Sequence, residues 1–214
     1  MNKPRTTWWV LLVLAAGTLV GCQQLPGWLA FVFEQPGKVD ALYKPPPGKR
    51  VLVFVDDVLN PLQYQPIKAE LTERLNDKLV QKKIAAATVP YEDMMQWAGT
   101  AGDFSHASVA EAGQALGADW VLYVHIDKFS VRDDETNPLW HGQMATTVRL
   151  VDVRAGRLWP LDRPDGYTVP RVETPVVDDS SASYGGEVAS QLAREMADRV
   201  TDLFCDHTVP PGKH

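Results

Sequence analysis

Hydrophobic and polar residues follow two different periods after residue 50, and together these periods predict a mixture of strands and helices. Residues 51–55 form an unbroken apolar run rich in β-branched side chains, which is typical of a strand covered on both faces. From Pro66 onward the apolar residues recur at every fourth position, which predicts a helix with one buried stripe: Ile67, Leu71, Leu75 and Leu79. We therefore expect the first strand to be central in a sheet, with this helix packed on it. A short strand at residues 85–90 should follow.

Two long alternating stretches dominate the second half of the chain. Residues 120–131 and 143–153 place large apolar side chains at every second position, which predicts two long strands with one buried face each. The polar stretch between them predicts that they pair as an antiparallel hairpin. Before them, Ser108 and Glu111 have the spacing of a capping box, and Gly117 suits the residue that ends the short helix.

The C-terminal part combines an irregular segment with a helix. Residues 160–183 are rich in Pro and Asp, and we expect a surface excursion that is at least partly irregular. Residues 184–206 predict a helix with one apolar stripe: Val188, Leu192, Met196, Val200 and Leu203. The whole pattern predicts an α/β fold with a mixed α+β sheet, a single domain over residues 51–206. We expect about five strands with helices packed on them, including a long antiparallel hairpin and a C-terminal helix. Residues 207–214 should form a disordered tail.

The first residues have the plan of an export signal. Lys3 and Arg5 precede the uncharged stretch 8–20, and this stretch ends at a small residue. A helix that spans a bilayer needs about 20 apolar residues, so this run is too short to cross one. Residues 1–21 are therefore predicted to be a signal peptide.

The end of that signal, Leu19-Val20-Gly21-Cys22, resembles the lipobox of bacterial lipoproteins. The resemblance implies that the Cys22 thiol is diacylated, that the signal is cut before it, and that the new amine is acylated. Three acyl chains, at about 0.8 kcal/mol per buried CH₂, would anchor the protein in a membrane. Gln23 rather than Asp follows the cysteine, which in enteric members implies the periplasmic face of the outer membrane. The alternative is an ordinary signal peptide with a chance cysteine.

Residues 22–50 contain five prolines and three glycines, a composition that favours an extended and unpacked chain. We interpret them as a tether that begins at the lipidated cysteine. Residues 28–33 within it are apolar and aromatic, and two placements stay open for them. They lie either in the lipid interface or against the domain.

Composition and charge narrow the classes of function. The 214-residue chain is 45% hydrophobic and 22% charged, as is usual for a globular protein, and its formal charge is −6. No run of Lys and Arg exceeds two residues, so we expect no nucleic-acid partner. Two cysteines can build neither the disulfide framework of a small secreted scaffold nor a four-thiolate metal site. The sequence predicts no cofactor.

The order of the predicted elements carries a second resemblance. Gly117, Ala118 and Asp119 lead into an apolar strand, and residues 151–153 precede Gly156 at a hairpin. After residue 50 the chain resembles a lipoprotein superfamily that includes the curli-secretion lipoprotein CsgG and the outer-membrane lipoprotein activators of penicillin-binding proteins. The resemblance implies a periplasmic α/β domain without catalytic residues that docks onto other envelope proteins. No pair of strands shows the lipid-facing alternation of a membrane-spanning hairpin, which argues against a secretion pore, and a pore is kept only as an alternative.

Asp56 and Asp57 follow the predicted central strand, at the end where open α/β sheets bind ligands. They are candidates for a ligand or ion site. The alternative, which we favour, is a solvated strand end that helps to cap the following turn.

His125, Asp127 and His141 invite the hypothesis of a metal site. Pairing of the two long strands about a loop near residue 135 would separate the two histidines by about 15–20 Å at 3.3 Å per residue. We therefore expect His125 to be a partly buried, hydrogen-bonded residue and predict no metal centre.

The chain has no G-x-S-x-G elbow, no H-E-x-x-H motif and no Gly-rich phosphate loop after a strand. Ser180, Ser181 and Ser183 precede a helix and are better explained as caps than as nucleophiles. Cys205 falls opposite the apolar stripe of the last helix, which predicts an exposed thiol near His207. The alternative is a small residue that is tucked against a neighbouring segment.

The sequence thus predicts a lipid-anchored periplasmic protein that works by binding envelope proteins, or further copies of itself, and not by catalysis. The predicted contact surfaces are the edge of the long hairpin and the acidic excursion at 162–179. One alternative is an envelope enzyme, hydrolase-like or metal-dependent, that uses Asp56 or Asp57. The other is a subunit of an oligomeric secretion pore.

Overall fold

The computed structural model describes residues 37–57, 66–100, 108–134, 138–179, 181 and 184–209. These residues fall into two compact units. The described part of the smaller unit is the antiparallel pair β1 (Gly37–Val39) and β8 (His207–Val209). Strand β8 corrects the expectation of a disordered tail at its three residues, because pairing with β1 satisfies backbone groups that a free tail leaves to water.

The larger unit, Asp40–Asp206, contains the helices and the main sheet that the structure describes. In chain order its elements are β2 (Arg50–Asp56), α3 (Pro66–Gln81), β3 (Ala87–Thr88), α4 (Tyr91–Thr100), α5 (Val109–Ala115), β4 (Trp120–Ser130), β5 (Gln143–Asp152), β6 (Gly156–Trp159), β7 (Tyr167–Glu173) and α6 (Tyr184–Asp202).

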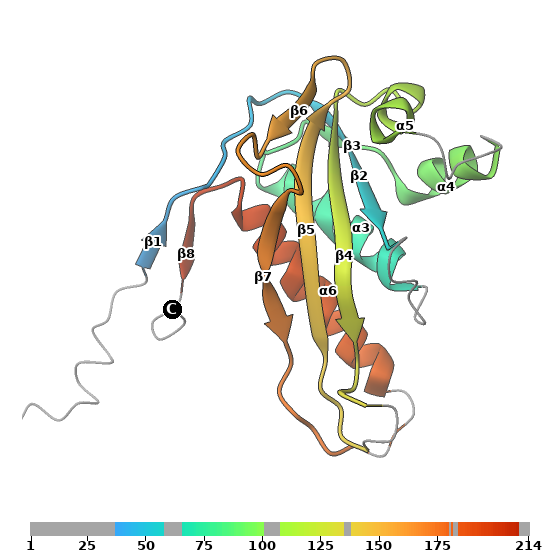
Figure 1. Cartoon of the computed structure of the whole chain (residues 1–214), viewed down its shortest axis with the longest axis vertical. Coiled ribbons are helices and arrows are strands. Elements are labelled where there is room, and N and C mark those ends of the chain that lie inside the picture. Colours follow the sequence, from blue (N-terminus) through green and yellow to red (C-terminus); the bar gives the residue numbers. More distant parts are fainter. Residues whose placement is uncertain are drawn as a thin grey trace, which may run out of the picture. The chain divides into compact units, whose positions relative to one another are not determined.

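The main sheet is mixed. Strand β2 is parallel to β3 and to β4, and β5 is antiparallel to β4. The order is β3-β2-β4-β5, and both β6 and β7 pair with the far side of β5 at different levels. Figure 1 shows β4 and β5 as the long strands in the middle of this sheet. The predicted α/β fold class is confirmed, and so are the long antiparallel hairpin and the C-terminal helix.

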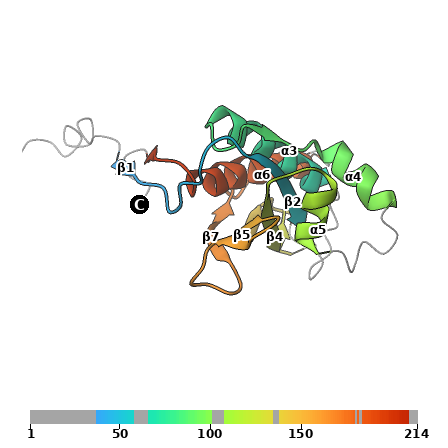
Figure 2. The same cartoon turned by 90° about the horizontal axis from the view of Figure 1, so that it is seen from above.

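Helices α3 and α6 lie together on one face of the sheet, which we call the covered face (Figures 1 and 2). Side chains alternate along a strand, so the even-numbered residues of β5 point toward these helices, as do those of β4 up to Ile126, where a bulge shifts the register. Leu122, Ile126 and Met144 are at most 1% exposed there. The apolar stripes predicted for both helices are confirmed, because every member is buried in the same core.

Helices α4 and α5 cover only one end of the opposite face, where they form a small second core with the sheet. The predicted capping box begins α5: Ser108 Oγ accepts from the Glu111 amide at 3.2 Å, and Glu111 Oε2 accepts from the Ser108 amide at 2.6 Å. Gly113 allows the close approach of this helix, since a Cβ there would lie 2.6 Å from Val121 Cγ2. Within the described chain, no helix packs on the rest of this face.

The segment before β2, residues 40–49, is folded onto the larger unit, and we call it the arm. The Tyr43 amide donates to Leu203 O at 3.1 Å, and the Tyr43 ring stacks on Trp159 with centroids 6.3 Å apart. Asp206 accepts from the Ala41 amide and from Lys44 Nζ. The prediction of an unpacked tether up to residue 50 is wrong for the arm, because burial of an aromatic ring outweighs the extended preference of its prolines.

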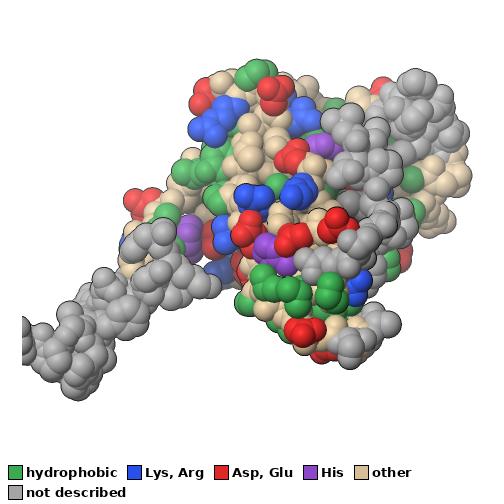
Figure 3. Space-filling view, turned by 60° about the horizontal axis from the view of Figure 1, so that its bottom comes forward, with side chains coloured by type: hydrophobic (Ala, Val, Ile, Leu, Met, Phe, Trp, Pro, Cys, Tyr) green, Lys and Arg blue, Asp and Glu red, His purple; other side chains and the backbone are tan. Residues whose placement is uncertain are grey.

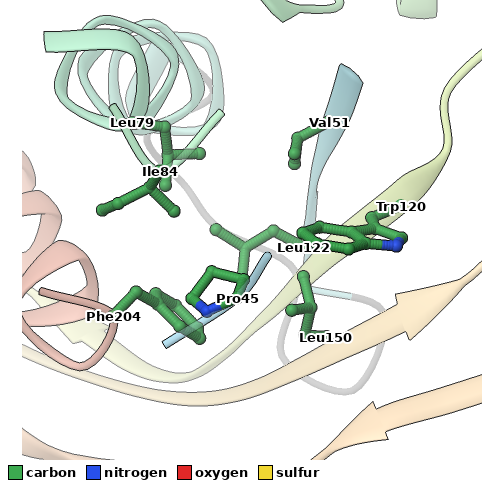
Figure 4. A pocket seen from close by; sticks show the side chains of 8 residues that line it. All are labelled: Pro45, Val51, Leu79, Ile84, Trp120, Leu122, Leu150 and Phe204. Carbon is green, nitrogen blue, oxygen red and sulfur yellow. The ribbon is translucent and has the colours of Figure 1, made fainter. Parts of the chain in front are cut away.

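Pro45 of the arm closes a small apolar pocket at the edge of the core (Figure 4). The pocket encloses about 230 Å³ of space including its opening to solvent. Its other walls are Val51, Leu79, Ile84, Trp120, Leu122, Leu150 and Phe204. Apolar side chains alone line it, and a ligand site usually adds a few converging polar groups, so we interpret it as a packing gap.

Three further elements differ from the sequence-based expectation. Strand β7 lies inside the segment expected to be a surface excursion, because Val169 and Val172 bury their side chains beside β5. Helix α4 was not predicted; it is short, and Met94 is its one buried residue. Helix α6 ends at Asp202, where a turn formed by the Phe204 amide and Thr201 O replaces the helical pattern.

Candidate functional site

The part of the sheet left without a helix is the candidate functional surface, and we call it the open face. It carries the side chains of Phe54, Asp56, Tyr123, His125, Lys128, Thr147, Arg149 and Arg157. Residues paired across neighbouring strands share a face, so the register forms rows. One row is Phe54, Tyr123 and Arg149, and the next is Asp56, His125 and Thr147. Figure 3 shows basic, acidic and histidine side chains side by side on the molecular surface and not in separate patches.

Aromatic stacking fixes the first row. The rings of Phe54 and Tyr123 stack with centroids 6.0 Å apart, and the His125 ring lies parallel to Tyr123 at 6.4 Å. The Arg149 guanidinium lies over the Tyr123 ring, 4.5 Å from its centroid. A cation over an aromatic face gains about 0.5–2 kcal/mol, so Arg149 is held in place by a neutral partner.

Two carboxylates flank His125 in the second row. Its Nδ1 lies 3.6 Å from Asp56 Oδ2, and its Nε2 lies 3.9 Å from Asp127 Oδ1. Both distances exceed a hydrogen bond, and the buried Nδ1 has no hydrogen-bond partner. His125 is therefore partly buried as predicted, but the expected hydrogen bond at Nδ1 is absent. Because the two nitrogens point in opposite directions, the flanking carboxylates cannot join His125 on one metal ion.

Both carboxylates accept hydrogen bonds from neighbouring hydroxyl groups. The Tyr123 hydroxyl donates to Asp56, and Thr147 Oγ1 donates to Asp127 at 2.8 Å. Burial, together with the hydrogen bond to Asp56 and the charge of Asp56, raises the pKa of Tyr123 to about 12. Tyr123 therefore stays protonated and remains a donor at neutral pH.

The structure does not bring Asp56 and Asp57 to one site. Asp57 is 7% exposed, and it accepts from Lys68 Nζ of helix α3 at 2.7 Å. Asp56 contacts Tyr123 of β4 instead. Successive residues of an extended chain point to opposite sides, which explains why the two carboxylates have different partners. In the described residues no group of three or more metal-binding side chains comes together.

His141 lies at the far end of the hairpin from His125. Its Nδ1 is 2.8 Å from Asp133 Oδ1, while His125 pairs with Thr147 in the ladder. Six residues of strand separate Thr147 from His141, which is about 20 Å. The predicted separation of the two histidines is confirmed.

Cys205 is half-buried, which agrees with the alternative of a small residue tucked against a neighbouring segment and not with the exposed thiol. Its Sγ lies 3.6 Å from Thr201 O and packs beside the main core. Burial, and then the charge of Asp202, raises the pKa of the Cys205 thiol. Helix α6 ends before this residue, so the helical periodicity that placed the thiol on the solvent side does not extend to it.

The hairpin edge predicted as a contact surface lies inside the sheet. Strand β4 pairs with β2 on its outer side, and β5 pairs with β6 and β7. The edge next to β5 is β7, which contains Pro170, and Arg199 Nη1 donates to Pro170 O. A proline in an edge strand removes a donor and discourages addition of another strand. The predicted contact surface at the hairpin edge is therefore corrected, because both edges of the hairpin are paired with other strands.

Several predicted residues lie outside the described part of the chain. They include the lipobox residues Leu19, Val20, Gly21 and Cys22, the aromatic segment 28–33, and Ser180 and Ser183. Ser181 is described, and its amide donates to Asp179 Oδ1. Among the described helices, none has the length and apolar character needed to cross a bilayer.

Tyr123, Arg149 and Lys128 were not among the predicted site residues. A signal for the first two was present, because both stand at odd positions of strands whose even positions are apolar. Period-two alternation assigns such residues to the opposite face. It does not show which part of that face is covered by helices and which part stays uncovered.

Comparisons with known proteins find solved structures only. No protein-family profile matches the chain, and no curated protein matches it. The chain is similar to lipoprotein GNA1162 from Neisseria meningitidis, with 14% identity and a TM-score of 0.42 over 72% of this chain and 99% of that one. It is similar to the PelC dodecamer from Paraburkholderia phytofirmans, with 13% identity and a TM-score of 0.39 over 80% and 98%. The LpoB C-terminal domain from Salmonella enterica matches at 16% identity and a TM-score of 0.32 over 62% and 84%. The similar solved structures thus include bacterial lipoproteins.

Proposed function

We propose that this chain is an envelope lipoprotein of the superfamily that contains CsgG, anchored through acylated Cys22 at the periplasmic face of the outer membrane. Its folded unit acts without catalysis and docks another envelope protein on the open face. The observation that carries this proposal is the contrast between the faces of the sheet. One is filled by α3 and α6, and the other presents fixed aromatic and charged side chains with no described helix over them.

The arrangement of the acidic residues favours docking over catalysis. Asp57 is paired with Lys68, and Asp56 accepts from a tyrosine that stays protonated. The contact with Asp56 does not turn Tyr123 into a nucleophile, because the raised pKa of Tyr123 keeps its hydroxyl protonated at neutral pH. We therefore interpret both carboxylates as parts of the framework that holds Tyr123 and helix α3.

The anchor is tested by acyl labelling and fractionation. The wild-type protein should incorporate labelled palmitate and sediment with outer membranes. Cys22→Ala should incorporate none and should appear in the soluble fraction. Membrane retention of an unlabelled Cys22→Ala protein would contradict the anchor.

Docking is tested by site-specific photo-crosslinking in intact cells. A photoreactive amino acid replaces Thr147 on the open face, and a matched variant carries it at Glu73, which is exposed on helix α3. We expect a discrete adduct from position 147 and none from position 73, and Arg149→Glu should abolish the adduct. Equal adducts from both positions, or no adduct from either, would contradict docking on the open face.

A further inference from the structure

Three basic side chains of the open face contact neutral groups. Arg149 lies over the Tyr123 ring, Arg157 Nη1 donates to Arg163 O at 2.9 Å, and Lys128 Nζ donates to Gln143 Oε1 at 2.7 Å. Each is held in position, but none of these contacts neutralises its charge. A cation that is already positioned loses little freedom on binding a carboxylate, so such groups favour anionic ligands.

The acidic side chains of the same region are used differently. Asp56 accepts from Tyr123, Asp127 accepts from Thr147, and Glu173 forms an ion pair with Arg171 at 3.1 Å. The chain as a whole has a formal charge of −6, so three cations held by neutral groups are a local exception to its acidic character.

The three cations stand on a diagonal line across β6, β5 and β4. Arg157 pairs with Val151, which is two residues from Arg149 along β5, and Lys128 pairs with Ala145, four residues from Arg149 on the other side. With about 3.3 Å per residue and about 4.8 Å between strands, the successive spacings are about 8 Å and about 14 Å. This total length corresponds to about seven residues of extended chain.

We propose that the open face binds an extended acidic segment of a partner protein, with carboxylates at its first, third and seventh positions opposite Arg157, Arg149 and Lys128. Alternate side chains of an extended chain share one side, so the three carboxylates all face the sheet. The inference rests on the proposed docking function and adds the chemistry of the partner. Asp127 lies beside the line between Arg149 and Lys128, so the intervening ligand residues should be uncharged.

The same geometry favours a narrow ligand over a broad anionic surface. Asp56 and Asp127 lie on strands β2 and β4, beside the diagonal, and would repel a flat sheet of phosphate groups. An extended peptide follows the diagonal and avoids both. Anionic lipid is therefore the competing outcome that the experiment has to exclude.

The test uses the mature acylated protein in detergent and a fluorescein-labelled seven-residue peptide. The peptide has Glu at positions one, three and seven and Thr elsewhere, and its control has Gln in place of each Glu. Fluorescence anisotropy at low salt should show at least tenfold tighter binding of the Glu peptide. The difference should shrink as salt is added, because exposed charge pairs are screened.

Substitutions locate the binding. Arg149→Gln and Lys128→Gln should each weaken binding of the Glu peptide at least threefold, while thermal unfolding stays cooperative. Arg194→Gln is the matched control, because Arg194 is exposed on α6 of the helix layer, and its effect should be less than twofold. A peptide with Glu at positions two, four and six should bind less tightly than the first peptide, because its spacing lets only two of the three carboxylates reach the cations together.

Four results would overturn the inference. The first two are equal affinity for the Glu and Gln peptides, and an equal loss of affinity for the Glu peptide in Arg194→Gln and Arg149→Gln. The third is an affinity that does not change when the carboxylates are moved. The fourth is displacement of the peptide by vesicles with 30% phosphatidylglycerol but not by neutral vesicles. If the peptide fails while position 147 still yields its adduct in cells, the inference fails and the docking function stands. If the adduct is also missing, the docking function itself fails.

Discussion

Neighbouring residues of strand β4 serve two different environments. Leu122, Val124 and Ile126 on the covered face are at most 1% exposed. The side chains of His125 and Asp127 on the open face are 13% and 37% exposed, so solvent access grows toward the hairpin end. The same strand thus contributes to the core on one side and displays polar groups on the other. Substitutions one residue apart on this strand should therefore change the core and the exposed polar surface separately.

The largest effect should come from the covered face. Leu122→Ala removes a fully buried side chain and leaves a cavity, so we expect a loss of about 2–5 kcal/mol in the free energy of unfolding. Urea denaturation followed by circular dichroism measures it. The matched open-face change, Thr147→Ala, should cost less than about 1 kcal/mol. Equal losses would contradict the division between the two faces.

A smaller effect is expected where α3 is tied to the end of β2. Asp57→Ala leaves the Lys68 ammonium without its carboxylate in a mostly buried position, and we expect a loss of about 1–3 kcal/mol. Adding Lys68→Met should recover part of that loss in the same denaturation experiment. An unchanged midpoint for Asp57→Ala would show that the pair is not structural.

On the open face, Tyr123→Phe removes the hydrogen bond to Asp56. We expect a loss of about 1 kcal/mol in the free energy of unfolding, the usual net value of one hydrogen bond. The pKa of Tyr123 is raised from 10.0 to about 12 in the folded state, so its stabilising contribution is complete below about pH 10. That contribution is lost as the pH rises from about 10 to about 12. Thermal unfolding across this range should decline less steeply in Tyr123→Phe than in the wild type. Parallel declines would contradict the contact with Asp56.

The smallest effect concerns reactivity and not stability. In a Cys22→Ser variant Cys205 is the one remaining thiol. Its burial and raised pKa predict slow reaction with a thiol reagent at pH 8, and at least tenfold faster reaction in denaturant. Rapid labelling of the native protein would contradict the burial of Cys205 and would support the exposed thiol that helical periodicity predicts.

The sequence predicts the covered face well because its signal is local. Apolar residues at every fourth position of α3 and α6, and at every second position of β4 and β5, identify the residues that meet in the core. The capping box of α5 and the left-handed Gly117, with φ of 66°, are equally local and are both found.

The open face cannot be predicted from local sequence patterns, because it depends on which strands pair with one another. Strand β7 is short, interrupted by Pro170 and irregular in register, so its segment looks like a loop until β5 is beside it. Pairing of β7 with β5 and of β2 with β4 moves the hairpin edges into the sheet. The row of Phe54, Tyr123 and Arg149 arises from three strands far apart in sequence. For this reason the sequence shows Asp56 and Asp57 as neighbours, but it does not show that one contacts Tyr123 and the other Lys68.

The carboxylate of Asp206 brings the two ends of the larger unit together. Asp206 accepts hydrogen bonds from the Ala41 amide and from Lys44 Nζ, so the larger unit, Asp40–Asp206, begins and ends at the same point. A segment whose ends meet can be inserted into a surface loop of an unrelated host protein without spreading that loop. The whole unit is therefore suited to transfer as a cassette, which would present its sheet on a carrier that has no lipid at all.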